Sequence, residues 1–233
     1  MSGKRRMQKS RHPRHRTRSG APGTTGNREI PGSLRIIGGE FGGRSLRWSG
    51  QPGTRPMKDD VRESLFNLVG GWIPDKFVLD LFAGSGAIGL EALSRGACHA
   101  TLIERHFPSA RIIRDNVASL EAEDRCTVVS SDTFFWSRQF LAAGPPRPVQ
   151  PWAVFCSPPW DLFVSRKQDL LNLIGSLYQA APANSLFVVE SDHRFDPAEL
   201  PEAPHWRVRE YPPAVISVIR PPGDNRPEST GAA

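Results

Sequence analysis

The sequence is poor in cysteine and contains no long hydrophobic run. Its 233 residues include three cysteines, which are widely spaced, odd in number and without the spacing of metal ligands. We therefore expect reduced, buried thiols, with no disulfide framework and no metal site. No apolar stretch approaches the length of a membrane span, and no signal-peptide core follows the basic start. These absences predict a cytoplasmic protein without a membrane anchor.

Acidic residues are missing from residues 1–28, which hold nine of the 30 Lys and Arg residues. The rest of the chain has 21 basic and 24 acidic residues, so the net charge of +6 comes from this segment. With little to bury, residues 1–32 and 221–233 are predicted to be disordered tails around one domain at 33–220. The basic tail adds salt-sensitive affinity for phosphate backbones or serves solubility, and both interpretations stay open.

The domain is organised around the stretch from Val78 to Glu91, which predicts a strand, a glycine turn and a helix. Glycine lets a backbone bend sharply and leaves room for a ligand beside it. The N-terminus of the following helix offers free N–H groups and a partial positive charge. The spacing Gly84-x-Gly86-x-x-Gly89 fits a dinucleotide-binding fingerprint, which alone does not identify the ligand.

Two further signals narrow the ligand class. Glu104 follows the next apolar run, where an acid would hold ribose hydroxyls. Downstream, Ser157-Pro158-Pro159-Trp160 ends another apolar strand, a pattern typical of enzymes that methylate exocyclic amino groups. Together these signals resemble S-adenosylmethionine-dependent methyltransferases. A nicotinamide-dependent oxidoreductase would need only the glycine spacing.

Strand-like and helix-like stretches alternate along the domain and end in an antiparallel pair, which predicts an α/β fold. We expect a Rossmann-like class I methyltransferase fold, with a doubly wound, mostly parallel sheet of about seven strands. A small hairpin is expected at about residues 34–48, followed by a helix capped by Asp59 or Asp60. Strands are expected at 100–104, 126–129, 152–156, 185–190, 206–211 and 214–220, and helices at 107–120, 133–141 and 166–180.

Three elements in combination resemble one family. They are the arginine-containing segment Arg35 to Arg44, the helix with Arg55-Pro56 to Asn67, and the motif from Asp80 to Glu91. This combination is similar to the bacterial 16S rRNA guanine-N2 methyltransferases, over about Leu34 to Arg220. The resemblance implies methyl transfer from S-adenosylmethionine to the N2 amine of a guanine. It also implies an enzyme that acts on ribosomal RNA or an assembling 30S particle, and we expect a monomer.

The resemblance also implies site residues. Ser157 and the Pro158 carbonyl would accept hydrogen bonds from the target amine, and Trp160 would stack on the base. The expected catalytic segment is Ser157, Pro158, Pro159 and Trp160. The expected cofactor contacts are Asp80, Phe82, Ala83, Gly84, Gly86, Glu104 and Asp132, where Asp132 also suits a helix cap. The expected RNA contacts are Arg35, Arg44, Arg47, Arg55 and Arg62, which are otherwise ordinary surface arginines.

The sequence departs from the family pattern at a few positions. Ser157 stands where the family usually has Asp, and a neutral hydroxyl supplies no negative charge to a developing cationic amine. Met57 and Lys58 replace threonines, and Trp152 replaces an acid at the start of its strand. Two alternatives therefore stay open: an amino methyltransferase for another RNA or DNA base, and a non-catalytic RNA-binding relative.

Overall fold

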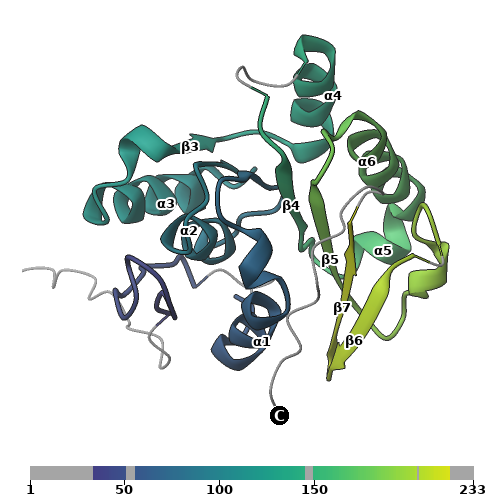
Figure 1. The fold of residues 1–233 in the computed structure, drawn as a ribbon, viewed down its shortest axis with the longest axis horizontal. Helices are drawn as coiled ribbons and strands as arrows, with labels where there is room; N and C mark the ends of the chain where they lie inside the picture. Colours follow the sequence, from purple (N-terminus) through teal and green to yellow (C-terminus); the bar gives the residue numbers. More distant parts are fainter. Residues whose placement is uncertain (1–33, 51–55, 145–148, 204, 221–233) are drawn as a thin grey trace, which may run out of the picture. The chain divides into compact units, whose positions relative to one another are not determined.

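The computed structural model describes residues 34–50, 56–144, 149–203 and 205–220. The two predicted tails and Arg55 lie outside the described residues. Seven strands form one sheet in the order β3-β2-β1-β4-β5-β7-β6 (Figure 1). The strands are β1 (Phe77–Asp80), β2 (His99–Ile103), β3 (Cys126–Val129), β4 (Trp152–Cys156), β5 (Leu186–Asp192), β6 (Arg207–Tyr211) and β7 (Ala214–Ile219).

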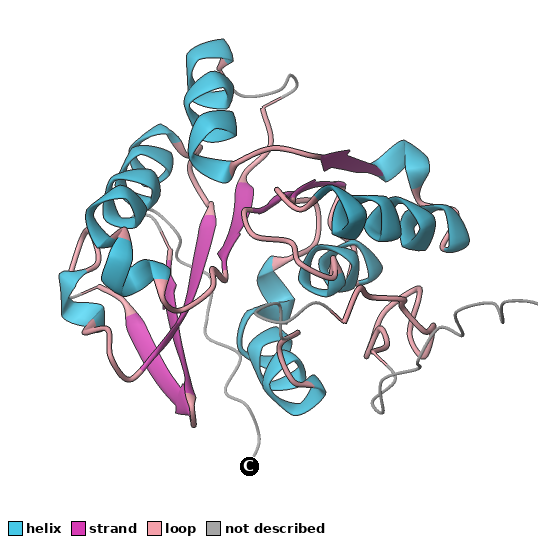
Figure 2. Cartoon of the chain, turned by 180° about the vertical axis from the view of Figure 1, so that it is seen from behind, coloured by secondary structure: helices cyan, strands magenta, loops and turns pink. Residues whose placement is uncertain are grey.

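Helices cover both faces of this sheet (Figure 2). They are α1 (Asp59–Val69), α2 (Ala87–Ser94), α3 (Phe107–Ser119), α4 (Thr133–Ala143), α5 (Leu162–Ser165) and α6 (Lys167–Ala180). Short 3₁₀ turns lie at Gly70–Trp72, Glu123–Arg125 and Pro197–Glu199. The predicted elements are present with small shifts at their ends, and the four-residue helix α5 was not predicted.

Two hydrophobic cores lie on opposite faces of the sheet. Successive residues of a strand point to opposite faces, so Val78 packs in one core and Leu79 in the other. The first core joins the sheet to α1, α2 and α3, and the second joins it to α4, α5 and α6. This division confirms the predicted doubly wound architecture.

The strand order reverses direction between β1 and β4. Strands β3, β2, β1, β4 and β5 are parallel, and β7 is antiparallel to both β5 and β6. In open α/β sheets, ligands bind beyond the carboxyl ends of the strands at such a reversal. The fold therefore predicts a ligand-binding site at the residues that follow β1 and β4.

The expected N-terminal hairpin is present as a short antiparallel pairing, in which the Ile36 N–H donates to the Arg44 carbonyl at 2.9 Å and the Leu46 N–H donates to the Leu34 carbonyl at 2.8 Å. A single antiparallel bridge joins Arg35 to Ser45, and Gly39 and Gly43 adopt positive φ values between them. The segment is held by burial of Leu34, Ile36, Phe41 and Leu46 in the first core. Main-chain pairing therefore shapes the hairpin, and burial of its apolar side chains holds it against the domain.

The expected cap of α1 is wrong. The N-cap residue is Lys58, whose side chain makes no capping hydrogen bond. Asp59 already belongs to the first turn and pairs with Arg62, while Asp60 accepts a hydrogen bond from the neighbouring Val61 N–H. Within the described residues, no helix is long and apolar enough to cross a membrane.

Candidate active site

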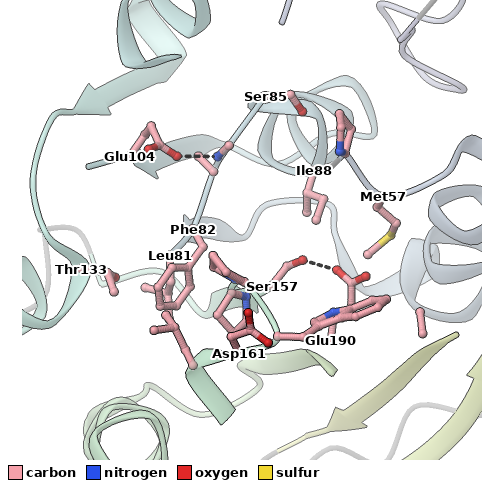
Figure 3. A pocket seen from close by; sticks show the side chains of 18 of the residues that line it. Met57, Leu81, Phe82, Ser85, Ile88, Glu104, Thr133, Ser157, Asp161 and Glu190 are labelled. Carbon is pink, nitrogen blue, oxygen red and sulfur yellow. Dashed lines mark hydrogen bonds between the residues drawn. The ribbon is translucent and has the colours of Figure 1, made fainter. Parts of the chain in front are cut away.

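A cavity of about 410 Å³ lies where the parallel strands end (Figure 3). Its wall comes from the loops after β1, β2, β3 and β4, from β5 and the loop after it, from the start of α1 and the residues before it, and from the turn between β6 and β7. The volume falls in the range of small-molecule sites. Nine predicted residues line it: Phe82, Ala83, Gly84, Glu104, Asp132, Ser157, Pro158, Pro159 and Trp160.

The glycine turn after β1 forms one side of this cavity. Gly84 and Gly86 have φ values of 55° and 79°, a region that side-chain-bearing residues rarely adopt. A Cβ atom on Gly86 would also lie 3.0 Å from Ile113. The turn leads directly into α2, where the Ser85 hydroxyl accepts from the Ala87 N–H at 3.4 Å and so occupies one of the first N–H groups of the helix.

Asp80 does not line the cavity, although it was predicted to contact the cofactor. It is fully buried, and its Oδ2 accepts a hydrogen bond of 3.1 Å from the Gly89 N–H. Burial raises the pKa of Asp80 to about 7, against the lowering effect of that N–H group. Asp80 therefore lies outside the cavity and stabilises the start of α2 through its hydrogen bond to the Gly89 N–H. Gly86 is likewise buried and lies outside the cavity lining.

Glu104 joins the ends of two neighbouring strands. Its Oε2 accepts from the Gly84 N–H at 2.9 Å (Figure 3), and its Oε1 accepts from the His106 N–H at 2.6 Å. A carboxylate has about four lone-pair positions, so both oxygens keep capacity for further donors. The half-buried Glu104 can thus hold a sugar diol beside the glycine turn. These acceptor oxygens fit the ribose hydroxyls of S-adenosylmethionine.

Asp132 both caps a helix and lines the cavity. Its Oδ1 accepts from the Phe135 N–H at 3.1 Å, which confirms that it caps α4. The same residue lines the cavity, and its Oδ2 lies 4.0 Å from the guanidinium of Arg166. Asp132 is therefore fixed in place before any ligand binds.

The Ser157-Pro158-Pro159-Trp160 segment lies across the cavity from the glycine turn. Pro158 is buried, Pro159 is exposed and Trp160 is half-buried. The Ser157 hydroxyl donates a hydrogen bond to Oε2 of Glu190, a residue of β5 that lines the same cavity (Figure 3). Glu190 is 7% exposed. Burial raises its pKa above the ordinary value, and the hydrogen bond from Ser157 offsets only part of this increase.

Glu190 was missed in the sequence. It ends the apolar run Leu186–Val189, and an acid at the end of such a run is the signal that identified Glu104. Two exposed arginines at the cavity, Arg166 and Arg194, were also missed. Arg166 lies 4.0 Å over the ring of Phe134, and Arg194 pairs with Asp161 and Asp192.

Of the predicted RNA contacts, three lie on the surface. Arg35, Arg44 and Arg47 are exposed, outside the cavity lining. Arg44 donates to the Ser119 carbonyl, and Arg47 lies 3.8 Å from Asp115. Their role in RNA binding stays a prediction.

Arg62 is fully buried, so its predicted contact with RNA is wrong. It donates to the carbonyls of Met57 and Arg35, and its Nε lies 3.9 Å from Oε2 of Glu91. The apolar side of α1 faces the core, and Arg62 lies on that side, where Glu91 of α2 supplies its counter-charge. Within the described residues, no group of three or more metal-binding side chains is found.

The chain matches the family model described as "Conserved hypothetical protein 95" over residues 34–216. It is 35% identical over 169 residues to "Putative rRNA methyltransferase YlbH" of Bacillus subtilis, covering 72% of this chain and 86% of that protein. It is 42% identical over 134 residues to "Ribosomal RNA small subunit methyltransferase D" of Escherichia coli, covering 58% and 64%. The solved "Putative methyltransferase yhhF" of Escherichia coli has a TM-score of 0.64 at 34% identity, covering 80% and 97%.

Proposed function

From the premise that this chain belongs to the family described as "Conserved hypothetical protein 95", we propose that it methylates the exocyclic N2 amine of a guanine in 16S ribosomal RNA. S-adenosylmethionine is the proposed methyl donor. The observation that carries the proposal is that one cavity joins the glycine turn and Glu104 to the Ser157–Trp160 segment. The glycine turn and Glu104 fit a nucleoside, and the Ser157–Trp160 segment fits a base with an exocyclic amine.

The cofactor end of the cavity is built by the turn and two acids. Phe82, Ala83 and Gly84, which line the cavity, would hold the methionine part, and Glu104 would accept hydrogen bonds from the ribose hydroxyls. Asp132, which also lines the cavity, would lie beside the adenine. When bound, S-adenosylmethionine supplies a methyl group activated by its positive sulfur.

The substrate end holds a base that has left its stack. Trp160 offers a face for stacking, which contributes about 1–3 kcal/mol per base in single-strand binders. The Ser157 hydroxyl and the Pro158 carbonyl accept hydrogen bonds from the amine and direct its lone pair along the line of attack. Pro158 and Pro159 stiffen this turn and remove competing N–H donors.

The RNA-facing surface of the proposed enzyme includes Arg35, Arg44 and Arg47, which supply positive charge outside the cavity. Phosphate contacts of this kind position a nucleic acid without reading its sequence. We propose a monomer acting in the cytoplasm on ribosomal RNA or on an assembling 30S particle.

The decisive experiment measures transfer of labelled methyl groups from S-adenosylmethionine to 16S RNA and to 30S particles from a strain that lacks this enzyme. Digestion to nucleosides identifies the product. Label in N2-methylguanosine is the expected result. Label in another methylated base would assign an amino methyltransferase of different specificity, and RNA binding without any label would assign a non-catalytic relative.

A further inference from the structure

Ser157 and Glu190 are neighbours because of strand register. In the parallel pair β4 and β5, Cys156 lies opposite Val189, so the next residues of the two strands are Ser157 and Glu190. Both line the cavity, and their side chains point toward one another (Figure 3). The hydrogen bond between them joins the residue that faces the substrate to a carboxylate on the adjacent strand.

The direction of this bond is fixed by chemistry. An ionised carboxylate only accepts hydrogen bonds, so the Ser157 hydroxyl donates its proton to Glu190. The lone pairs of the Ser157 oxygen are then left for a donor in the cavity, such as an amine. A neutral serine could donate to the substrate instead, and Glu190 prevents this orientation.

We propose that Glu190 is the positioning residue of methyl transfer, which orients the Ser157 hydroxyl as an acceptor and takes up, through it, the proton that the methylated amine releases. This inference rests on the proposed function and names the group that supplies the negative charge missing at Ser157.

The proton balance of the step is complete. The amine lone pair forms a bond to the methyl carbon while the carbon–sulfur bond breaks, and the bonding pair stays on sulfur. The amine nitrogen, now positively charged, gives one proton to the Ser157 oxygen. Ser157 passes its own proton to Oε2 of Glu190, which later releases it to water. No oxidant or reductant takes part.

The electrostatic setting of Glu190 suits this role. A buried carboxylate with a raised pKa is a better proton acceptor than an exposed one, provided that it is ionised when the reaction starts. On β7, the residue opposite Glu190 is the uncharged Ile216. The other charged residues of the cavity, none of which has a hydrogen bond to Glu190 among the described contacts, are Lys58, Glu104, Arg105, Asp132, Asp161, Arg166 and Arg194.

The first test moves the negative charge from residue 190 to residue 157. Glu190→Gln keeps an acceptor for Ser157 but removes the charge, and kcat should fall about 100-fold or more. The double variant Ser157→Asp/Glu190→Gln restores one carboxylate at the substrate and should recover most of that loss. Glu123→Gln, an exposed residue outside the cavity, is the matched control. A double variant that folds, binds S-adenosylmethionine normally and is no faster than Glu190→Gln would overturn the proposal.

The second test is the pH profile of kcat. Glu190 must be ionised, so the rate should rise with pH through its raised pKa and stay level above it. This acidic limb should disappear in Glu190→Gln and persist in Glu123→Gln. An unchanged limb in Glu190→Gln contradicts the proposal.

A third test needs neither RNA nor cofactor. In the full chain labelled with ¹³C-glutamate, NMR titration of the Glu190 carboxyl should give a higher pKa in Ser157→Ala than in the wild type, because the serine bond stabilises the ionised form. Equal values would mean that the two groups are not coupled and would overturn the proposal. If the wild type methylates no RNA, the proposed function fails. The titration still measures the coupling between Ser157 and Glu190 in that case.

Discussion

The guanidinium of Arg62 lies 3.9 Å from the carboxylate of Glu91, and both side chains are fully buried. Glu91 also accepts from the Ile37 and Gly38 N–H groups, and its Oε1 lies 2.7 Å from Nε of Arg95. This one carboxylate joins the N-terminal segment, α1 and α2. The cavity-forming start of α1 is therefore fixed to the helix that follows the glycine turn.

Removing one member of this pair should destabilise the protein strongly. Arg62→Ala leaves Glu91 with less compensation in a buried site, and we expect the free energy of unfolding to fall by about 3–5 kcal/mol. Urea unfolding measures the change. Arg35→Ala is the control, because its exposed pair with Asp59 contributes at most about 1 kcal/mol. Equal, small losses in the two variants would contradict the structural role of Arg62.

The third glycine of the motif should not tolerate a methyl group. A Cβ atom on Gly89 would lie 2.0 Å from Leu102 and 3.3 Å from Oδ2 of Asp80. Gly89→Ala would push α2 away from β2, at a cost of about 1–3 kcal/mol. Gly175→Ala in α6 meets only ordinary contacts with Pro201 and should stabilise by up to about 1 kcal/mol. Urea unfolding of both variants tests this contrast, which a stability gain in Gly89→Ala would refute.

The buried Asp80 should make stability depend on pH. Its pKa is raised to about 7 in the folded state, so the folded protein holds a proton that the unfolded chain loses at lower pH. The Asp80 contribution to stability therefore falls as pH rises from about 4 to about 7 and stays at its low value above that range.

Asp80→Asn removes this titration while keeping an oxygen that can accept from the Gly89 N–H. We expect the free energy of unfolding of the variant, relative to the wild type, to increase between pH 5 and pH 8. Urea unfolding of the two proteins at both pH values measures the difference. A relative stability independent of pH would show that Asp80 is ionised in the folded state at both.

The sequence predicted the fold well because its signals are local. The run Trp152–Cys156 is apolar throughout, which identifies a strand buried on both faces, and the observed bounds agree. Residues directly after such strands, including Glu104 and Ser157, follow from the same pattern. The short helix α5 has four residues, too few to show a hydrophobic period.

What the sequence did not reveal depends on contacts between distant residues. The Ser157–Glu190 pair requires the register of two strands whose residues lie 33 positions apart. Arg62 was misjudged because a charged residue on an amphipathic helix usually faces water. Its burial makes sense only once Glu91 of α2 is placed beside α1.

Glu104 offers the sharpest test of the cofactor site. Glu104→Gln keeps a similar shape but replaces a charged acceptor with a neutral amide. Loss of a hydrogen bond to a charged group costs about 1.5–3 kcal/mol, so the Kd for S-adenosylmethionine should rise about 10- to 100-fold. Titration calorimetry on the full chain measures this change without any RNA.

A control separates ligand binding from folding in this experiment. Glu104 also accepts from the Gly84 and His106 N–H groups, so its replacement can loosen the turn. Glutamine can still accept from one of them, and we expect a much smaller change in Tm than in Kd. Glu123→Gln should alter neither value, because Glu123 lies outside the cavity. An unchanged Kd in Glu104→Gln would remove this residue from the cofactor site, and the glycine turn would then have to hold the nucleoside through its backbone alone.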